Sequence, residues 1–149
     1  MATAYASAVI DAPIERVWEI VRDFNGLPKW FPIAVDSVIE DGKRADQVGC
    51  VRSFHTADGA HVRERLLSLD DAGFNLTYNF ETPAFPVSNY LAAMRLRRVT
   101  ETGATFAEWT ATFDERPEDE GVYVELIAKA VFAEGWQALR RAVQGQGTA

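Results

Sequence analysis

An arginine and a glutamate stand at positions where the local sequence pattern calls for apolar residues. The stretch GCVRSFHTADGAHVRERLLSLDD, residues 49–71, predicts two strands joined by a tight turn at Asp58-Gly59. Arg52 and Glu64 fall in the apolar half of the alternation on these two strands. A buried pair of this kind can bind the polar end of a small molecule. It can also transfer a proton while the arginine stabilises the charge that develops.

The length of the loop decides whether these two side chains meet. A two-residue turn would place Arg52 opposite Arg65, which is a like-charge pair. A three-residue loop at 57–59, with Gly59 at positive φ after a type I turn, instead places Arg52 opposite Glu64. We predict the three-residue loop because it leaves one apolar face around a single pair of opposite charges.

The next hairpin is expected to bring aromatic residues beside the charged pair. If residues 71–73 form the same kind of loop, Leu66 lies opposite Tyr78 and Glu64 lies opposite Phe80. Both rings then share the face of the sheet that carries the pair, because side chains alternate between the two faces of a strand.

A further hairpin is predicted at Thr102-Gly103. A short turn there places Leu96 opposite Trp109 and Arg97 opposite Glu108, so that Trp109 points inward. With the charged pair and two phenols among aromatic rings, the inward side chains predict a ligand chamber rather than a plain core. This inward set is Trp30, Phe31, Arg52, Phe54, Glu64, Tyr78, Phe80, Tyr90 and Trp109.

The rest of the sequence predicts the helices and strands that carry these residues. An N-terminal strand leads to a helix that begins near Pro13 and ends at Asn25-Gly26, and LPKWFP forms a single helical turn. Strands broken by glycine turns follow over residues 33–113. One long helix over residues 118–143 ends the pattern.

The long helix has small residues at the centre of its expected inward face. Ala128 and Gly135 allow either close packing on the sheet or room for a ligand, which would need a pocket of roughly 300 Å³ or more. At 100° per residue the inward face comprises Val124, Ala128, Val131, Phe132, Gly135, Leu139 and Ala142.

Composition limits the function classes. A chain of 149 residues with 48% hydrophobic residues predicts a single domain over residues 1–149. Its net charge of -7 opposes binding to nucleic acid or anionic membranes. We see no secretory or membrane-spanning segment and therefore expect a cytoplasmic protein, as a monomer or weak homodimer. With one cysteine, Cys50, and no phosphate-binding or dinucleotide motif, we expect no metal and no cofactor.

Six motifs in order resemble one known superfamily. They are DFNGLPKWFP, GCVR, RERLLSLDD, LTYNF, VSNY and AEWTATFD. They are similar to the SRPBCC superfamily (START and polyketide cyclase/dehydrase proteins), in the branch that includes lachrymatory factor synthase and bacterial polyketide cyclase-like proteins. The resemblance implies an α+β helix-grip fold. In that fold a seven-stranded antiparallel curved sheet wraps around a long C-terminal helix, with two short helices between strands 1 and 2.

The same resemblance implies roles for individual residues. In the lachrymatory factor synthase of that branch, the arginine of the GC-x-R motif and a glutamate of the next strand handle a proton, and these motif positions match Arg52 and Glu64. Tyr90 and Trp109 match aromatic residues of the family pocket. The predicted catalytic residues are Arg52, Glu64 and Tyr90. The predicted ligand-binding residues are Trp30, Phe31, Phe54, Tyr78, Phe80, Trp109 and Phe132.

Three interpretations of the pair stay open. In an isomerase, cyclase or dehydratase-like enzyme, Glu64 moves a proton on a small hydrophobic molecule, while Arg52 polarises its oxygen and holds Glu64 ionised. In a carrier or sensor, the pair only anchors the polar end of that molecule. In a purely structural pair, desolvation can exceed the Coulomb attraction, which makes this interpretation the least favourable energetically.

Overall fold

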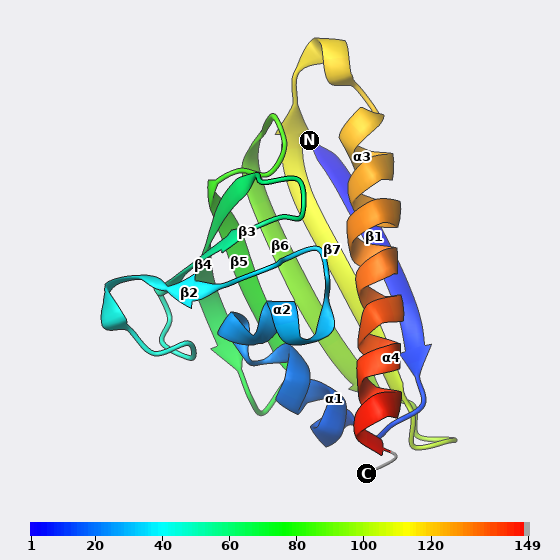
Figure 1. The fold of residues 1–149 in the computed structure, drawn as a ribbon. Helices are drawn as coiled ribbons and strands as arrows, with labels where there is room; N and C mark the ends of the chain where they lie inside the picture. Colours follow the sequence, from blue (N-terminus) through cyan, green and yellow to red (C-terminus); the bar gives the residue numbers. More distant parts are fainter. Residues whose placement is uncertain (148–149) are drawn as a thin grey trace.

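The computed structural model describes residues 1–147 and places a long helix against one face of a curved antiparallel sheet (Figure 1). The sheet has seven strands in the order β1-β7-β6-β5-β4-β3-β2. Two short helices, α1 (Ile14–Val21) and α2 (Leu27–Trp30), lie between β1 and β2, so the predicted arrangement is confirmed. The strands are β1 Ala2–Ile10, β2 Val38–Ile39, β3 Val51–His55, β4 His61–Asp70, β5 Asn75–Thr82, β6 Val87–Arg98 and β7 Thr105–Glu115.

The helical segments cover the concave side and one end of the sheet (Figure 1). Among the described residues, no helix is long and apolar enough to cross a membrane. The α-helices are α1 Ile14–Val21, α2 Leu27–Trp30, α3 Val122–Leu126 and α4 Glu134–Gly147. The 3-10 turns are η1 Phe24–Gly26, η2 Glu40–Gly42 and η3 Pro117–Asp119, and a π-helical segment, η4 Ile127–Ala133, joins α3 to α4.

The β3–β4 hairpin has the predicted register. Arg52 on β3 lies directly opposite Glu64 on β4. The backbone N–H of Thr56 donates to the carbonyl of Ala60 at 2.9 Å, so the loop comprises the three residues between them. Gly59 has a φ of 89°, in the left-handed region that favours glycine. The loop length that the alternating pattern required is therefore present.

The β4–β5 hairpin reaches its predicted register by a different route. Asp70 pairs with Asn75, so the loop has four residues instead of the expected three. A β-bulge between Leu66 and Ser68 adds one residue to β4 and compensates for the longer loop. Both predicted pairs are present: Leu66 with Tyr78, and Glu64 with Phe80.

The predicted register of the β6–β7 hairpin is wrong by two residues. Met94, and not Leu96, pairs with Trp109. The backbone N–H of Val99 donates to the carbonyl of Ala104, which closes a longer loop than the expected tight turn. A shift of two residues keeps each side chain on its face, so Trp109 still points inward. On the outer face, Glu108 lies opposite Arg95 and not Arg97.

The inward face of the long helix also differs from the prediction. Val124, Ala128, Val131 and Ala142 pack against the core as predicted, but they are only partly buried. The π-helical segment uses i→i+5 hydrogen bonds, so successive side chains turn by less than 100° and the buried face shifts along the helix. The buried residues that the helical projection missed are Ile127, Trp136, Ala138 and Val143.

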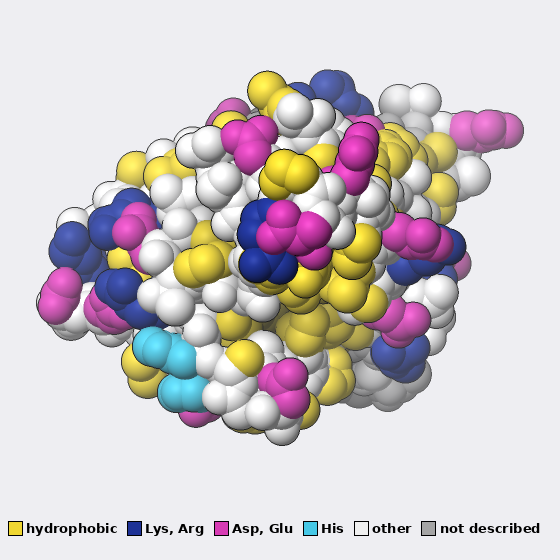
Figure 2. Space-filling view, turned by 90° about the horizontal axis from the view of Figure 1, so that it is seen from above, with side chains coloured by type: hydrophobic (Ala, Val, Ile, Leu, Met, Phe, Trp, Pro, Cys, Tyr) yellow, Lys and Arg dark blue, Asp and Glu magenta, His cyan; other side chains and the backbone are white. Residues whose placement is uncertain are grey.

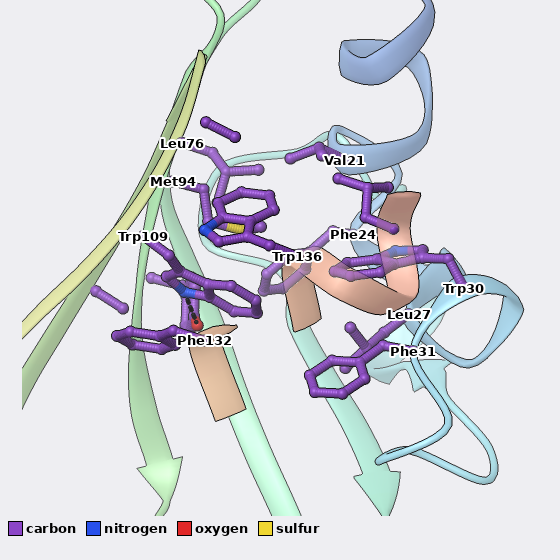
Figure 3. Packing of buried hydrophobic residues seen from close by; sticks show 14 of the residues in the cluster. Val21, Phe24, Leu27, Trp30, Phe31, Leu76, Met94, Trp109, Phe132 and Trp136 are labelled. Carbon is purple, nitrogen blue, oxygen red and sulfur yellow. Dashed lines mark hydrogen bonds between the residues drawn. The ribbon is translucent and has the colours of Figure 1, made fainter. Parts of the chain in front are cut away.

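Gly135 serves close packing and leaves no room for a ligand at that point. A Cβ atom there would lie 2.6 Å from Cζ3 of Trp109 and 3.1 Å from Cε2 of Phe31. Figure 3 shows Trp109 between the rings of Phe132 and Trp136, next to the helix that carries Gly135. The helix therefore packs directly against the Trp109 and Phe31 rings at a position that carries no side chain.

We expect Gly135→Ala to lower the free energy of unfolding by about 1–3 kcal/mol, because the added methyl group overpacks against Trp109. Alanine favours helix over glycine by about 1 kcal/mol, so steric overlap must exceed that gain. Urea denaturation measures the change. Gly145→Ala is the matched control in the same helix, since a Cβ added there meets no described atom within 4 Å apart from its chain neighbours and the adjacent backbone of its own helix. Stabilisation of both variants would contradict the close approach.

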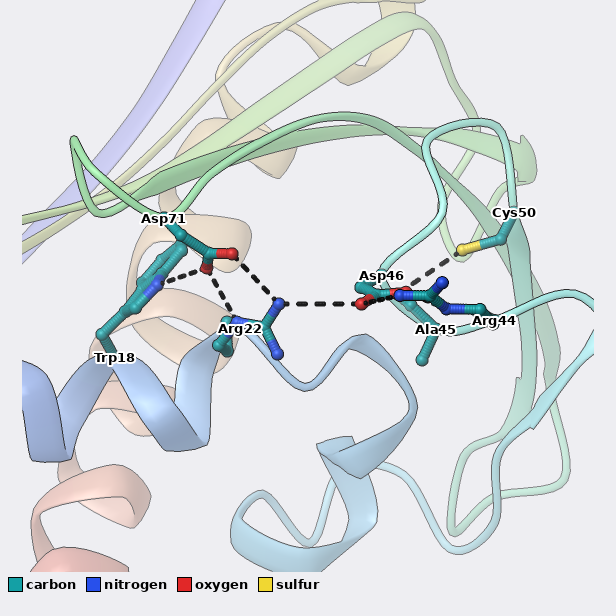
Figure 4. A network of polar contacts seen from close by, with 7 residues as sticks. All are labelled: Trp18, Arg22, Arg44, Ala45, Asp46, Cys50 and Asp71. Carbon is teal, nitrogen blue, oxygen red and sulfur yellow. Dashed lines mark hydrogen bonds and ion pairs between the residues drawn. The ribbon is translucent and has the colours of Figure 1, made fainter.

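A polar network ties α1 to both strands that carry the charged pair (Figure 4). Asp71, which follows β4, accepts hydrogen bonds from Trp18 Nε1 and Arg22 Nε, each at 2.8 Å. Arg22 also lies 3.9 Å from a carboxylate oxygen of Asp46, in the connection that precedes β3. Hydrogen bonding to Arg22 lowers the pKa of Asp71 below its ordinary value. The network therefore fixes α1 relative to the site.

Candidate functional site

Arg52 and Glu64 form a buried ion pair on the inner face of the sheet. Nε and Nη2 of Arg52 lie 2.8 and 2.7 Å from the same oxygen, Oε1 of Glu64. Nη1 of Arg52 donates to the backbone carbonyl of Phe24 in η1 at 3.1 Å. Only 6% of Arg52 and 5% of Glu64 is exposed. The short helices and the sheet thus enclose the guanidinium together.

Aromatic rings complete the environment of the arginine. Its Cζ atom lies 4.0 Å from the centre of the Phe24 ring, 5.2 Å from that of Tyr78 and 5.9 Å from that of Phe54. A cation above the face of an aromatic ring is attracted to it, more strongly when water is excluded. These rings offset part of the cost of burying the charge.

Burial changes the proton affinity of Glu64. Desolvation raises the pKa of this carboxyl above its ordinary value, while the charge and hydrogen bonds of Arg52 oppose the rise. The sequence led us to expect that Arg52 holds Glu64 ionised; in the structure, burial has the larger effect. A carboxyl with a raised pKa exchanges protons more readily near neutral pH than an ordinary one.

Two buried phenols lie beside the pair. Nε1 of Trp109 donates to the hydroxyl oxygen of Tyr78 at 3.0 Å. Because this oxygen already accepts a hydrogen bond, the Tyr78 hydroxyl has its own proton to donate elsewhere. The ring centres of Tyr78 and Tyr90 are 6.5 Å apart. Burial raises the pKa of both phenols, so both remain protonated hydrogen-bond donors at neutral pH.

These groups line a pocket of about 360 Å³. The tip of the β3–β4 hairpin, the β5–β6 loop and Val131 of the long helix form its other walls. Figure 2 views the molecule from the end of these loops and shows hydrophobic side chains gathered in the middle of that face. The predicted site residues in the lining are Phe31, Arg52, Phe54, Glu64, Tyr78, Phe80, Tyr90 and Trp109.

Trp30 and Phe132, which were also predicted to contact the ligand, lie outside this lining. Trp30 stacks on Phe31 with ring centres 5.6 Å apart. Phe132 stacks on Trp109 at 4.6 Å and an angle of 15° (Figure 3). Both rings pack behind a residue of the pocket wall and hold it in place.

Several lining residues were not among the predicted ones. Val62 was detectable, because the alternation that turns Phe54 inward turns its partner Val62 inward as well. Phe85 lies in a loop between two prolines, where no periodic pattern indicates its direction. The additional lining residues are Leu27, Ile33, Thr56, Ala57, Asp58, Ala60, Val62, Ala84, Phe85 and Val131.

Other reactive residues lie away from this chemistry. His55 and His61 stack on each other with ring centres 4.9 Å apart, and both are exposed. Within residues 1–147, no group of three or more His, Cys, Asp or Glu side chains could hold a metal ion. Burial raises the pKa of the Cys50 thiol, which disfavours the nucleophilic thiolate. By contrast, the Arg52–Glu64 pair lines a pocket together with the hydroxyl-bearing Tyr78 and Tyr90.

Solved structures of known proteins resemble the whole chain. Protein XoxI from Bacillus cereus is 30% identical, with a TM-score of 0.82 over 97% of this chain and 96% of that one. A protein from Thermobifida fusca is 29% identical, with a TM-score of 0.85 over 96% and 93% of the two chains. The di-domain ARO/CYC BexL from the BE-7585A biosynthetic pathway shares the fold at 16% identity. Its TM-score is 0.78 over 97% of this chain and 47% of its own.

A family model gives the same assignment from the sequence. The model described as polyketide cyclase / dehydrase and lipid transport matches residues 1–144, which include every strand and all of the pocket lining. With this match over nearly its full length, the chain belongs to the polyketide cyclase/dehydrase and lipid-transport family.

Proposed function

We propose that the pocket binds a small hydrophobic molecule with one polar end, and that Arg52, Glu64 and Tyr90 catalyse a proton transfer on it. The observation that carries this proposal is the buried ion pair in the pocket wall. A pair with no function would face the desolvation cost of two charges that apolar residues avoid. At an otherwise aromatic surface, the pair supplies the polar groups that orient a ligand.

The contacts suggest which oxygen reacts. Both contacts from Arg52 fall on Oε1 of Glu64, so we assign proton exchange with the ligand to Oε2. Glu64 takes a proton from a carbon next to a carbonyl group, and the electron pair moves to the carbonyl oxygen. Arg52 and the Tyr90 hydroxyl stabilise that oxygen. Glu64 then returns the proton to another atom, which completes an isomerisation or assists a cyclisation or dehydration.

Known relatives support this reaction class. The family description includes cyclases and dehydrases, and BexL, which shares the fold, is an ARO/CYC protein. Because lipid transport is part of the same description, the second candidate is a carrier of a small hydrophobic molecule. In a carrier the same pair anchors the polar end of the ligand, and no chemistry follows.

A thermal-shift screen tests the binding step that both candidates require. We expect small phenols, polyketide-like ketones or sulfenic-acid mimics to stabilise the protein. A ligand at 100 times its Kd adds about 2.7 kcal/mol to the free energy of unfolding. Val131→Phe, which reduces the pocket from the helix side, should weaken the shift. If no compound of these three classes stabilises the wild-type protein, the proposed function is wrong.

A further inference from the structure

The pocket lining contains more negative than positive charge. Arg52 is the cation among the lining residues, and Glu64 and Asp58 carry carboxylates. Glu64 already compensates the charge of Arg52 at hydrogen-bond distance. The whole chain has a net charge of -7, so its field also repels anions. A carboxylate ligand would therefore enter a pocket without an uncompensated cation.

The contacts that Arg52 already makes also disfavour a carboxylate ligand. Carboxylates bind arginine best through two parallel N–H groups. Nε and Nη2, which form one such edge of the guanidinium, both contact Glu64, and Nη1 donates to the Phe24 carbonyl. A ligand carboxylate would have to displace Glu64 from that edge, or lie beside it as a like charge.

The donors that remain suit a neutral oxygen. Tyr78 accepts a hydrogen bond from Trp109, so its O–H group is left to donate. Tyr78 and Tyr90 both line the pocket, and their hydroxyl groups also interact with each other, so together they leave at least one uncharged donor for a ligand. A ketone or phenol oxygen accepts such single hydrogen bonds without a change in the charge of the site.

We propose that the Arg52–Glu64 pair makes this pocket selective for neutral oxygen compounds, ketones and phenols, over carboxylates, with Glu64 as the residue that determines this selectivity. The inference rests on the proposed function in that it uses the same pocket. It concerns which ligands bind, and it holds for an enzyme and for a carrier alike.

Two probes of similar size test the selectivity: 2-acetonaphthone, a neutral ketone, and 2-naphthoate, a carboxylate. Affinities are measured by calorimetry at about pH 8, because burial raises the pKa of Glu64 and a high pH favours its charged form. We expect wild-type protein to bind the ketone at least about tenfold more tightly than the carboxylate. Glu64→Gln leaves the charge of Arg52 uncompensated, so naphthoate affinity should rise about tenfold or more while ketone affinity changes little.

Two control variants isolate the cause. Glu81→Gln removes the same charge from the Arg65–Glu81 pair, whose atoms are 2.6 Å apart and which lies outside the pocket, so neither affinity should change. The double variant Arg52→Met/Glu64→Gln removes the cation as well, so the gain in naphthoate affinity should disappear.

Each result separates the two proposals. Wild-type protein that binds naphthoate as tightly as the ketone would overturn the selectivity while leaving ligand binding intact. Glu64→Gln protein that folds but gains no naphthoate affinity would also overturn it. If that variant fails to fold, the wild-type ratio of the two affinities decides alone. If neither the ketone nor the carboxylate binds, the result would count against both the selectivity and the proposed pocket function.

Discussion

Glu64→Gln is expected to lower the turnover of a bound ligand by about 10²–10⁴, the usual effect of removing a general base. The amide keeps the shape of the side chain and can still accept a hydrogen bond from Arg52, so the fold should be retained. The measurement is kcat and KM on a ketone or phenol identified by the ligand screen, together with the unfolding temperature. A fall in kcat at nearly constant KM would show that Glu64 acts in the reaction step.

The outer-face variant Glu81→Gln is again the matched control, because it alters an Arg–Glu pair away from the pocket. Its kcat should equal that of the wild-type protein. A Glu64→Gln variant with normal kcat would exclude Glu64 as the base. Wild-type protein that binds ligands of all three classes but converts none of them would favour the carrier.

Arg52→Met is expected to lower the free energy of unfolding by up to about 3–5 kcal/mol, the full cost in a dry structural pair, because it leaves the buried Glu64 carboxylate without its partner. Glu64 can offset part of this loss by taking up a proton, and water in the pocket reduces it further. Chemical denaturation at several pH values measures both effects. The double variant Arg52→Met/Glu64→Gln should recover much of the lost stability, because no charge is then left unpaired.

The pH dependence of Arg52→Met has a definite sign. Burial raises the pKa of Glu64 in the folded protein above its value in the unfolded chain. The folded state then binds more protons than the unfolded state between these two pKa values, so stability falls as the pH rises through them. Without the opposing charge of Arg52, this loss of stability should extend to higher pH and become larger in total than in the wild-type protein. Stability that rises with pH in this window would contradict a buried, raised-pKa carboxyl.

Together these variants distinguish a pair that acts on a ligand from a pair that only stabilises the fold. A structural pair would show a large loss of stability in both single variants and unchanged ligand affinities. A functional pair in a pocket would show altered binding or turnover in Glu64→Gln at nearly normal stability. The position of the pair in the pocket wall favours the second outcome.

The pairing of Arg52 with Glu64 follows from the local sequence pattern alone. Side chains alternate strictly between the faces of a strand, and a charged pair within an apolar face allows few registers. Gly59 then selects the loop length, because its left-handed backbone conformation disfavours other residues. The order of the strands and helices followed from equally local signals, namely turn residues and hydrophobic periodicity.

Features that depend on several elements at once could not be predicted from this local pattern. The β6–β7 register and the buried face of the long helix differ from the prediction because loop length and π-helical hydrogen bonding are not visible in hydrophobic periodicity. Phe132 and Trp30 lie behind the pocket wall, while Phe85 from a proline-flanked loop helps to line it. The raised pKa of Glu64 likewise depends on how completely distant segments exclude water from it. Packing between elements far apart in the chain sets all of these properties, and a local pattern carries no information about that packing.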